Sequence, residues 1–240
     1  METVTRKSEV KIYLDQCIHT YKTKGTAALA KAIRTHILSR KVKFPLLEYC
    51  AHTLHQTVAD EEQIDLCDTI EAYKTEGGNV LLGIILQDRL EKHYLQSIQK
   101  ATEYISKANA WYVCDIIGER VYGYALLTMP EPSIPEIRKL SSHSSHWVVR
   151  SVGAGAHYAI KKGLGQEDVT SIFKILLTQS NAKHKEIRQG IGWAAKTTAR
   201  FHPDIIASFE NEIQDSSAVA NWFRKKIEIG LNRNKYAQRD

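Results

Sequence analysis

Apolar residues with helical spacing run through almost the whole chain, and this feature constrains its fold more than any other. In VKIYLDQCI and VTSIFKILL, for example, apolar side chains recur every three or four residues, the period that gathers them on one face of an α-helix. No stretch alternates apolar and polar residues convincingly, as a half-exposed strand would. The prolines stand where the helical pattern breaks or restarts, and a cluster of them predicts a turn at residues 130–135. The sequence therefore predicts an all-α chain of short helices and short turns.

Tryptophans recur in the second half at an interval typical of helical repeats. Three predicted helices share a tryptophan with a charged residue about one turn later: Trp111 with Asp115, Trp147 with Arg150, and Trp193 with Lys196. The tryptophans are 36 and 46 residues apart, close to the period of HEAT-like helical pairs, which is roughly 40 to 47 residues. Such pairs stack into a solenoid with a concave groove. We expect a HEAT-like α-α superhelix, although each tryptophan taken alone also fits a role as a core residue.

The domain organisation follows from the turns. Those between the predicted helices are short, and none is long enough to be an interdomain linker. We therefore expect one domain over residues 1–240.

Positive charge is concentrated in the C-terminal part. Residues 1–140 hold 18 Lys+Arg and 18 Asp+Glu, whereas residues 141–240 hold 15 and 9, which places the whole formal charge of +6 there. Lysine and arginine that neutralise phosphates release counterions, so this asymmetry favours a polyanionic partner. A basic surface that is only solvated is the alternative.

Several classes of protein are disfavoured by the composition. The cysteines, Cys17, Cys50, Cys67 and Cys114, form no CxxC pair, so we expect reduced core thiols. The histidines show no metal-ligand spacing, and GAGAHYA is better explained by close helix packing than by phosphate binding. No apolar run approaches the roughly 20 residues of a membrane span, and the N-terminus is too polar for a signal peptide. We expect a cytoplasmic monomer without a bound metal.

Three segments carry a resemblance to a known family. They are AWYVCD, HWVVR and EIRQGIGWAAK, and they lie in this order within residues 110–200. Together they resemble the AlkD family of DNA glycosylases, HEAT-like proteins that excise alkylated purines. The first segment is similar to the family's Trp-x-x-x-Asp element, and the third is similar to a family helix whose Trp and Arg fall on Trp193 and Lys196. Arg150, in the second, falls on a basic residue that the family uses against the DNA backbone.

The resemblance implies a site and a partner. Asp115 would stabilise a sugar with oxocarbenium character, while Trp111 and Trp193 would contact the sugar or the cationic base through their rings. The partner would be double-stranded DNA, alkylated or distorted, and no cofactor is implied. The DNA-binding set would combine Arg150 and Lys196 with further cations within or beside the helix of Lys196, namely Lys183, Lys185 and Arg188.

The sequence departs from the family pattern at three positions. Lys196 stands where the family has arginine, so it keeps the charge but loses the planar fork that binds phosphate bidentately. Ala32 aligns with an aromatic residue of the family glycosylases, and Lys41 replaces a glycine in the turn before Pro45. With Ala32 we expect an aromatic substrate contact of the family to be missing, and with Lys196 we expect weaker contact to the DNA backbone.

Three functions remain open. The first is a glycosylase that excises purines alkylated at N3 or N7, which are positively charged. The second is a DNA-binding relative without this activity, since Ala32 and Lys196 weaken the substrate site. The third is a protein-interaction scaffold, a role common among HEAT-like solenoids.

Overall fold

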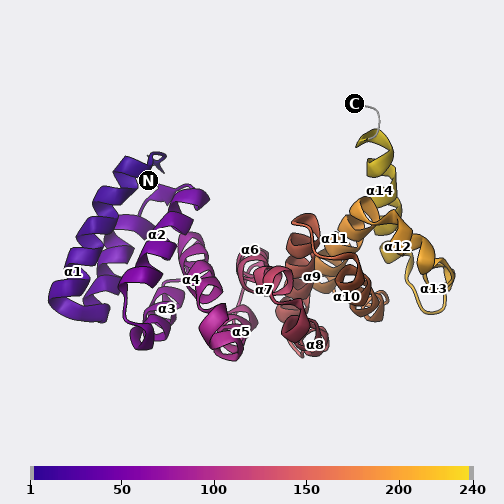
Figure 1. Ribbon diagram of the computed structural model, residues 1–240, viewed down its shortest axis with the longest axis horizontal. Coiled ribbons are helices and arrows are strands. Elements are labelled where there is room, and N and C mark those ends of the chain that lie inside the picture. The colour runs from indigo at the N-terminus through magenta and orange to yellow at the C-terminus, as the bar shows by residue number, and fades with distance from the viewer. Residues whose placement is uncertain (1–2, 238–240) are drawn as a thin grey trace. The chain divides into compact units, whose positions relative to one another are not determined.

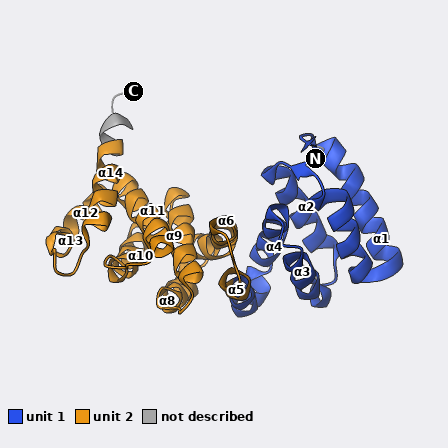
Figure 2. Cartoon of the chain, turned by 180° about the vertical axis from the view of Figure 1, so that it is seen from behind, with its two compact units in different colours: residues 1–101 blue, residues 102–240 orange. Residues whose placement is uncertain are grey.

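The structure is a computed structural model that describes residues 3–237, and it is built almost entirely of helices (Figure 1). The chain divides into two compact units, residues 1–101 and 102–240 (Figure 2). The prediction of an all-α helical-repeat fold is confirmed. The prediction of one domain over residues 1–240 stays a prediction.

The first unit is a helical assembly with one short strand pair. Its elements, in chain order, are β1 (Thr3–Val4), α1 (Lys7–Ile33), the π-helical η1 (Arg34–Leu38), β2 (Lys41–Val42), α2 (Phe44–Thr57), the 3-10 turn η2 (Asp60–Glu62), α3 (Gln63–Ala72) and α4 (Glu76–Asp88), followed by α5 (Leu90–Ser106), which crosses into the second unit. β1 and β2 pair in parallel over two residues each, and so short a pair leaves no alternating pattern in the sequence.

Pro45 occupies the first turn of α2, where a missing N–H costs no helical hydrogen bond. The departure at Lys41 falls in β2, on an exposed residue. Ala32 is buried in α1, so its side chain belongs to the core of this unit.

The second unit consists of helices stacked in two layers. Its elements are α6 (Trp111–Ile117), the π-helical η3 (Gly118–Gly123), α7 (Tyr124–Thr128), α8 (Pro130–Leu140), α9 (His146–Lys161), α10 (Gln166–Thr178), α11 (Lys185–Phe201), α12 (Pro203–Ser208), α13 (Glu210–Gln214) and α14 (Asn221–Ala237). α9 packs against α6, η3 and α11, and α11 packs against α14. α8 and α10 contact each other and pack against α9 and α11 as the second layer (Figure 1).

The proline cluster does not form the predicted turn. α8 begins at Pro130 and contains Pro132 and Pro135. The first four N–H groups of a helix have no partner within it, so Pro130 and Pro132 fit the first turn without losing a hydrogen bond. Pro135 lies deeper in the helix and gives up one bond. The interruption between α7 and α8 comes before the cluster, at Met129, whose backbone is not helical.

The four cysteines lie in the cores of the two units. All four cysteines are free and buried, as predicted, and burial raises the pKa of each thiol to about 12. Within residues 3–237, no helix is both long and apolar enough to cross a membrane.

Candidate nucleic-acid interface

A glycine contact brings the predicted catalytic carboxylate to the neighbouring helix. A Cβ on Gly118 would lie 2.8 Å from the Cβ of Ser151, so only glycine lets η3 approach α9 this closely. Asp115, three residues before Gly118 at the end of α6, consequently reaches Arg150 on α9. The resemblance implied a catalytic role for Asp115 and a DNA-backbone role for Arg150, and the structure joins the two side chains by hydrogen bonds.

Arg150 is held by a set of four hydrogen bonds. Its Nε and Nη2 donate to the two carboxylate oxygens of Asp115 at 2.9 and 2.8 Å, and its Nη1 donates to Glu186 Oε2 at 2.7 Å and to Gln189 Oε1 at 2.8 Å. The residue is only 6% exposed. Burial opposes the charge of Arg150, but hydrogen bonding to Asp115 and the charges of Asp115 and Glu186 outweigh it and raise the pKa of the guanidinium. The guanidinium of Arg150 is directed at the carboxylates of Asp115 and Glu186. The contact with a DNA phosphate predicted for Arg150 stays a prediction.

The cluster of Asp115, Arg150 and Glu186 carries more acid than base. Two carboxylates share one guanidinium, which leaves one formal negative charge. Trp111, one turn before Asp115, is 58% exposed, and its ring centroid lies 5.8 Å from Cζ of Arg150. An exposed aromatic ring beside net negative charge is suited to a cationic ligand.

A second glycine contact brings α9 and α11 together. A Cβ on Gly153 would lie 2.1 Å from the backbone of Gly190, a distance that no side chain can occupy. The close approach allows Arg150 to reach Glu186 and Gln189. It also confirms that GAGAHYA serves helix packing.

Trp193 lies against a histidine that the sequence analysis did not select. The rings of Trp193 and His157 stack with centroids 3.9 Å apart and an interplanar angle of 24°. The Thr197 hydroxyl donates to the carbonyl of Trp193 at 3.0 Å and also lies within hydrogen-bond distance of His157 Nδ1, at 2.6 Å. Trp111 lies beside Arg150 and Trp193 lies beside His157. Arg150 and His157 are seven residues apart on α9, which is about 10 Å along its axis. The two tryptophan rings therefore do not stack on each other.

Around this ring pair lies a basic pocket of about 260 Å³. Its cationic lining residues are Lys161, Lys196, Arg200 and Arg233. Burial lowers the pKa of Lys196, and the charges of Arg233 and Lys226 lower it further. Burial, together with the charges of Lys161 and Lys196, also lowers the pKa of His157 to about 4, so the imidazole is neutral at pH 7. Among the residues that the structure describes, no carboxylate lines this pocket, and a bound anion would relieve its concentrated positive charge.

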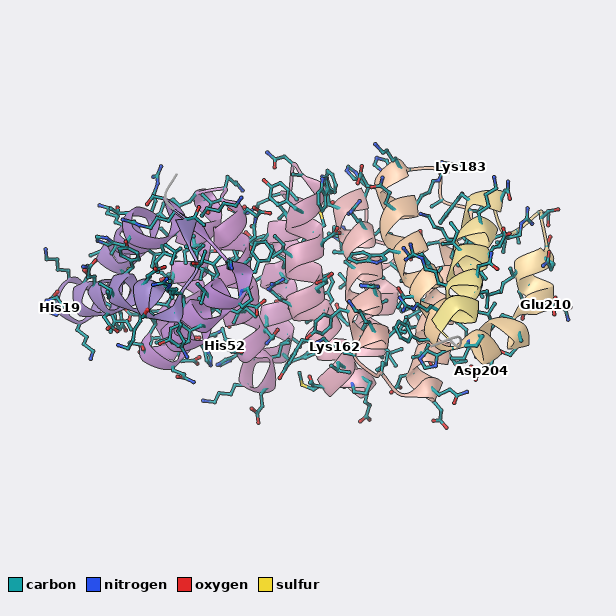
Figure 3. All side chains as sticks on the ribbon, turned by 90° about the horizontal axis from the view of Figure 1, so that it is seen from above. His19, His52, Lys162, Lys183, Asp204 and Glu210 are labelled. Atoms are coloured by element: carbon teal, nitrogen blue, oxygen red, sulfur yellow. The ribbon has the colours of Figure 1, made fainter. Side chains whose placement is uncertain are left out.

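The remaining predicted cations lie near the start of α11. Lys183 and Arg188 line another pocket, together with Trp222 and Lys225 of α14. Lys185 is exposed and does not line it. In Figure 3, Lys183 and Lys162 mark opposite ends of the helices of this unit.

Sequence reasoning missed Glu186, Gln189 and His157. Helical spacing gave a signal for each of them. Glu186 lies seven residues and Gln189 four residues before Trp193, and His157 lies seven residues after Arg150, which places each on the same helical face as a selected residue. Within the described part of the chain, no group of three or more His, Cys, Asp or Glu side chains is arranged to hold a metal ion.

Known proteins are similar to this chain in sequence pattern and in fold. AlkD2 from Streptococcus mutans, in its crystal structure, matches with a TM-score of 0.67 and 14% identity, over 85% of this chain and 97% of that one. A designed armadillo repeat protein in complex with a (KR)4 peptide matches with a TM-score of 0.51 and 11% identity, over 92% of this chain and 99% of that one. At such low identity these likenesses establish the helical-repeat fold alone. No curated protein sequence matches.

The family assignment comes from the sequence itself. Residues 22–224 match the family described as DNA alkylation repair enzyme, which confirms the resemblance carried by the three motif segments and supports a role in alkylation repair. Since the match spans most of the chain, this protein belongs to the DNA alkylation repair enzyme family.

Proposed function

We propose that this protein binds DNA and excises purines alkylated at N3 or N7 by hydrolysing the glycosidic bond. One observation carries the proposal: a net negative cluster with an exposed tryptophan and a basic pocket lie on the same face of α9 and α11. Phosphates of the DNA backbone would bind at the basic pocket, and the cationic base would bind near Asp115 and Trp111.

The chemistry asks little of the protein. A purine alkylated at N3 or N7 is already a cation, so it leaves without a strong acid catalyst. The sugar gains oxocarbenium character as the bond breaks, and a fixed carboxylate stabilises that charge. Asp115 would do this, and its two hydrogen bonds from Arg150 hold it in one orientation.

A second candidate is DNA binding without excision. Both oxygens of Asp115 accept hydrogen bonds from Arg150, and one face of Trp193 is covered by His157. Each of these contacts reduces what the side chain can offer to a substrate. In this version the basic pocket holds DNA and the acidic cluster is structural.

A base-release assay separates the candidates. Wild type, Asp115→Asn and the matched control Glu186→Gln, which removes the other carboxylate on Arg150, are each incubated with methylated duplex DNA, and free methylpurine is measured. Release by wild type and by Glu186→Gln, but not by Asp115→Asn, supports excision. DNA binding by wild type with no release at excess protein supports the second candidate. Absence of binding at low salt overturns both.

A further inference from the structure

The start of α14 and the start of α11 enclose a pocket separate from the Asp115 cluster. Its volume is about 430 Å³, and it is lined by Lys183, Arg188, Trp222 and Lys225, with small or neutral residues between them. Ala220, just before α14, donates its N–H to the carbonyl of Ser180 at 3.3 Å, so the loop before α11 is fixed to the start of α14. The pocket is therefore a feature of the packed fold.

The charged lining of this pocket is entirely positive. Among residues 3–237, none of Lys183, Arg188 and Lys225 forms an ion pair with a carboxylate, and the Nζ of Lys183 donates to the neutral side-chain oxygen of Asn181 at 3.2 Å. Three cations around one cavity repel one another, and a bound anion would relieve that repulsion.

Arg188 is oriented by an aromatic ring. Its Cζ lies 5.6 Å from the centroid of Trp222, a cation–π contact that holds the planar guanidinium in place. Arg150 differs from Arg188, because the N–H groups of Arg150 are directed at Asp115, Glu186 and Gln189. The fork of Arg188 is exposed and has no carboxylate partner, and such a fork matches the geometry of phosphate oxygens.

From this geometry we infer that the pocket is a binding site for a phosphate group, with Arg188 as its bidentate donor and Lys183 and Lys225 as flanking charges. The phosphate belongs either to the DNA backbone or to a small phosphorylated ligand. Only the first source rests on the proposed function. In this site the ring of Trp222 supports Arg188.

Inorganic phosphate tests the site directly. The full chain is titrated with phosphate at constant ionic strength, and the backbone signals of residues 221–225 are followed by NMR. Wild type should show saturable shifts, and a Lys183→Ala/Lys225→Ala double variant should bind at least about tenfold more weakly, since each lost charge removes a favourable interaction. Lys174→Ala on α10, which removes an exposed lysine outside the pocket, should bind as wild type does. Because all three side chains are exposed, the variants should fold, and circular dichroism checks this.

A second arm identifies the source of the phosphate. If the double variant lowers the salt dependence of duplex binding by about two released counterions, the ligand is backbone phosphate. If phosphate binding is lost in the double variant but duplex binding is unchanged, the ligand is a small phosphorylated molecule. If wild type shows no saturable shift, or if the double variant and Lys174→Ala bind phosphate alike, the inference is overturned. Loss of base release in Asp115→Asn is independent of all these outcomes, so failure of this site and failure of the proposed function are distinguishable.

Discussion

Arg150 is the residue on which the acidic cluster depends. Removing its side chain would leave Asp115 and Glu186, whose side chains are 14% and 18% exposed, without their cation. Breaking a buried pair from one side typically costs 3 to 5 kcal/mol, and we expect Arg150→Ala to lower the free energy of unfolding by about 3 kcal/mol. Urea denaturation measures this.

Arg150→Lys is the control for charge. Lysine keeps the positive charge but cannot donate to both oxygens of Asp115 and to Glu186 in one plane. The free energy of unfolding of Arg150→Lys should therefore lie between that of wild type and that of Arg150→Ala. A loss below about 1 kcal/mol for Arg150→Ala would show that the cluster is solvated like an ordinary surface pair.

His157 predicts a pH dependence of stability. Its pKa is lowered to about 4 in the folded chain, whereas an unfolded histidine titrates near 6.5. Between these values the unfolded state binds more protons, so stability falls as the pH drops from about 6.5 to 4, and nothing is lost above that range. Allowing for partial exposure, we expect a loss of about 2 kcal/mol.

Comparison with His157→Gln isolates this contribution from those of the other histidines. Glutamine does not titrate, so the difference in unfolding free energy between wild type and His157→Gln should change between pH 7 and pH 4.5. A difference that stays constant over that range would mean that His157 is as easily protonated in the fold as in the unfolded chain.

At the scale of residues, the sequence predicted which side chains belong to the site better than it predicted which hydrogen bonds join them. The motifs identified Trp111, Asp115 and Arg150, and the structure brings these three together. They did not reveal that Arg150 is also bound by Glu186, because this bond joins two helices and depends on their register. Local spacing gives no information about register between helices.

Among the elements, the helices of the second unit depend on glycines where they cross. Gly190→Ala would place a methyl group 2.2 Å from the carbonyl oxygen of Arg150, so α11 would have to move away from α9. Overpacking of this kind costs 1 to 3 kcal/mol or more, and we expect a loss of about 3 kcal/mol. The change in the midpoint of thermal unfolding measures it.

Gly165→Ala is the matched control for the glycine change. A Cβ at Gly165 would meet only the Asp168 carboxylate, at 3.6 Å, and its backbone conformation is open to other residues. This variant should unfold within about 1 kcal/mol of wild type. Equal losses for Gly190→Ala and Gly165→Ala would contradict close packing of α9 on α11.

Helix period predicted the elements well, and exceptions have physical reasons. Apolar spacing identified α10 from VTSIFKILL, and the helical pattern restarts at Pro45, the second residue of α2, and at Pro203, the first residue of α12. A proline cluster at residues 130–135 predicts a turn because proline breaks helices, but proline also fits a first helical turn, and α8 begins at Pro130. β1 and β2 were missed because two paired residues carry no alternating pattern.

For the whole molecule, the charge distribution predicts how the proposed DNA binding responds to salt. The excess of positive charge lies in residues 141–240, and part of it lines the basic pocket around Trp193. Each phosphate contact contributes about 0.9 to the slope of log K against log salt. We expect a Lys196→Ala/Arg200→Ala variant to make this negative slope shallower by about two.

A Lys22→Ala/Lys24→Ala variant removes the same charge from exposed positions on α1 in the first unit. Its slope should equal that of wild type, as measured by fluorescence anisotropy on a labelled duplex. If both double variants lower the slope equally, the charge acts through the net charge of the chain rather than through this pocket.

The repeat interval of the tryptophans and the family motifs were enough to predict the fold class and the family. They could not predict that the selected cations fall into different environments, with Arg150 among carboxylates, Lys196 among cations and Arg188 over Trp222. Composition counts charges, but only packing decides which of them faces an acid and which faces an open pocket.

The central claim is that Asp115 acts on a bound, alkylated duplex. The most direct test is the single-turnover rate of methylpurine release with protein in excess over methylated DNA, measured for wild type and Asp115→Asn at equal DNA occupancy. We predict release by wild type and a rate at least about 10²-fold lower for Asp115→Asn, the usual loss when a group that stabilises transition-state charge is removed. Equal rates for the two proteins, or no release by wild type on DNA that it binds, would contradict the claim.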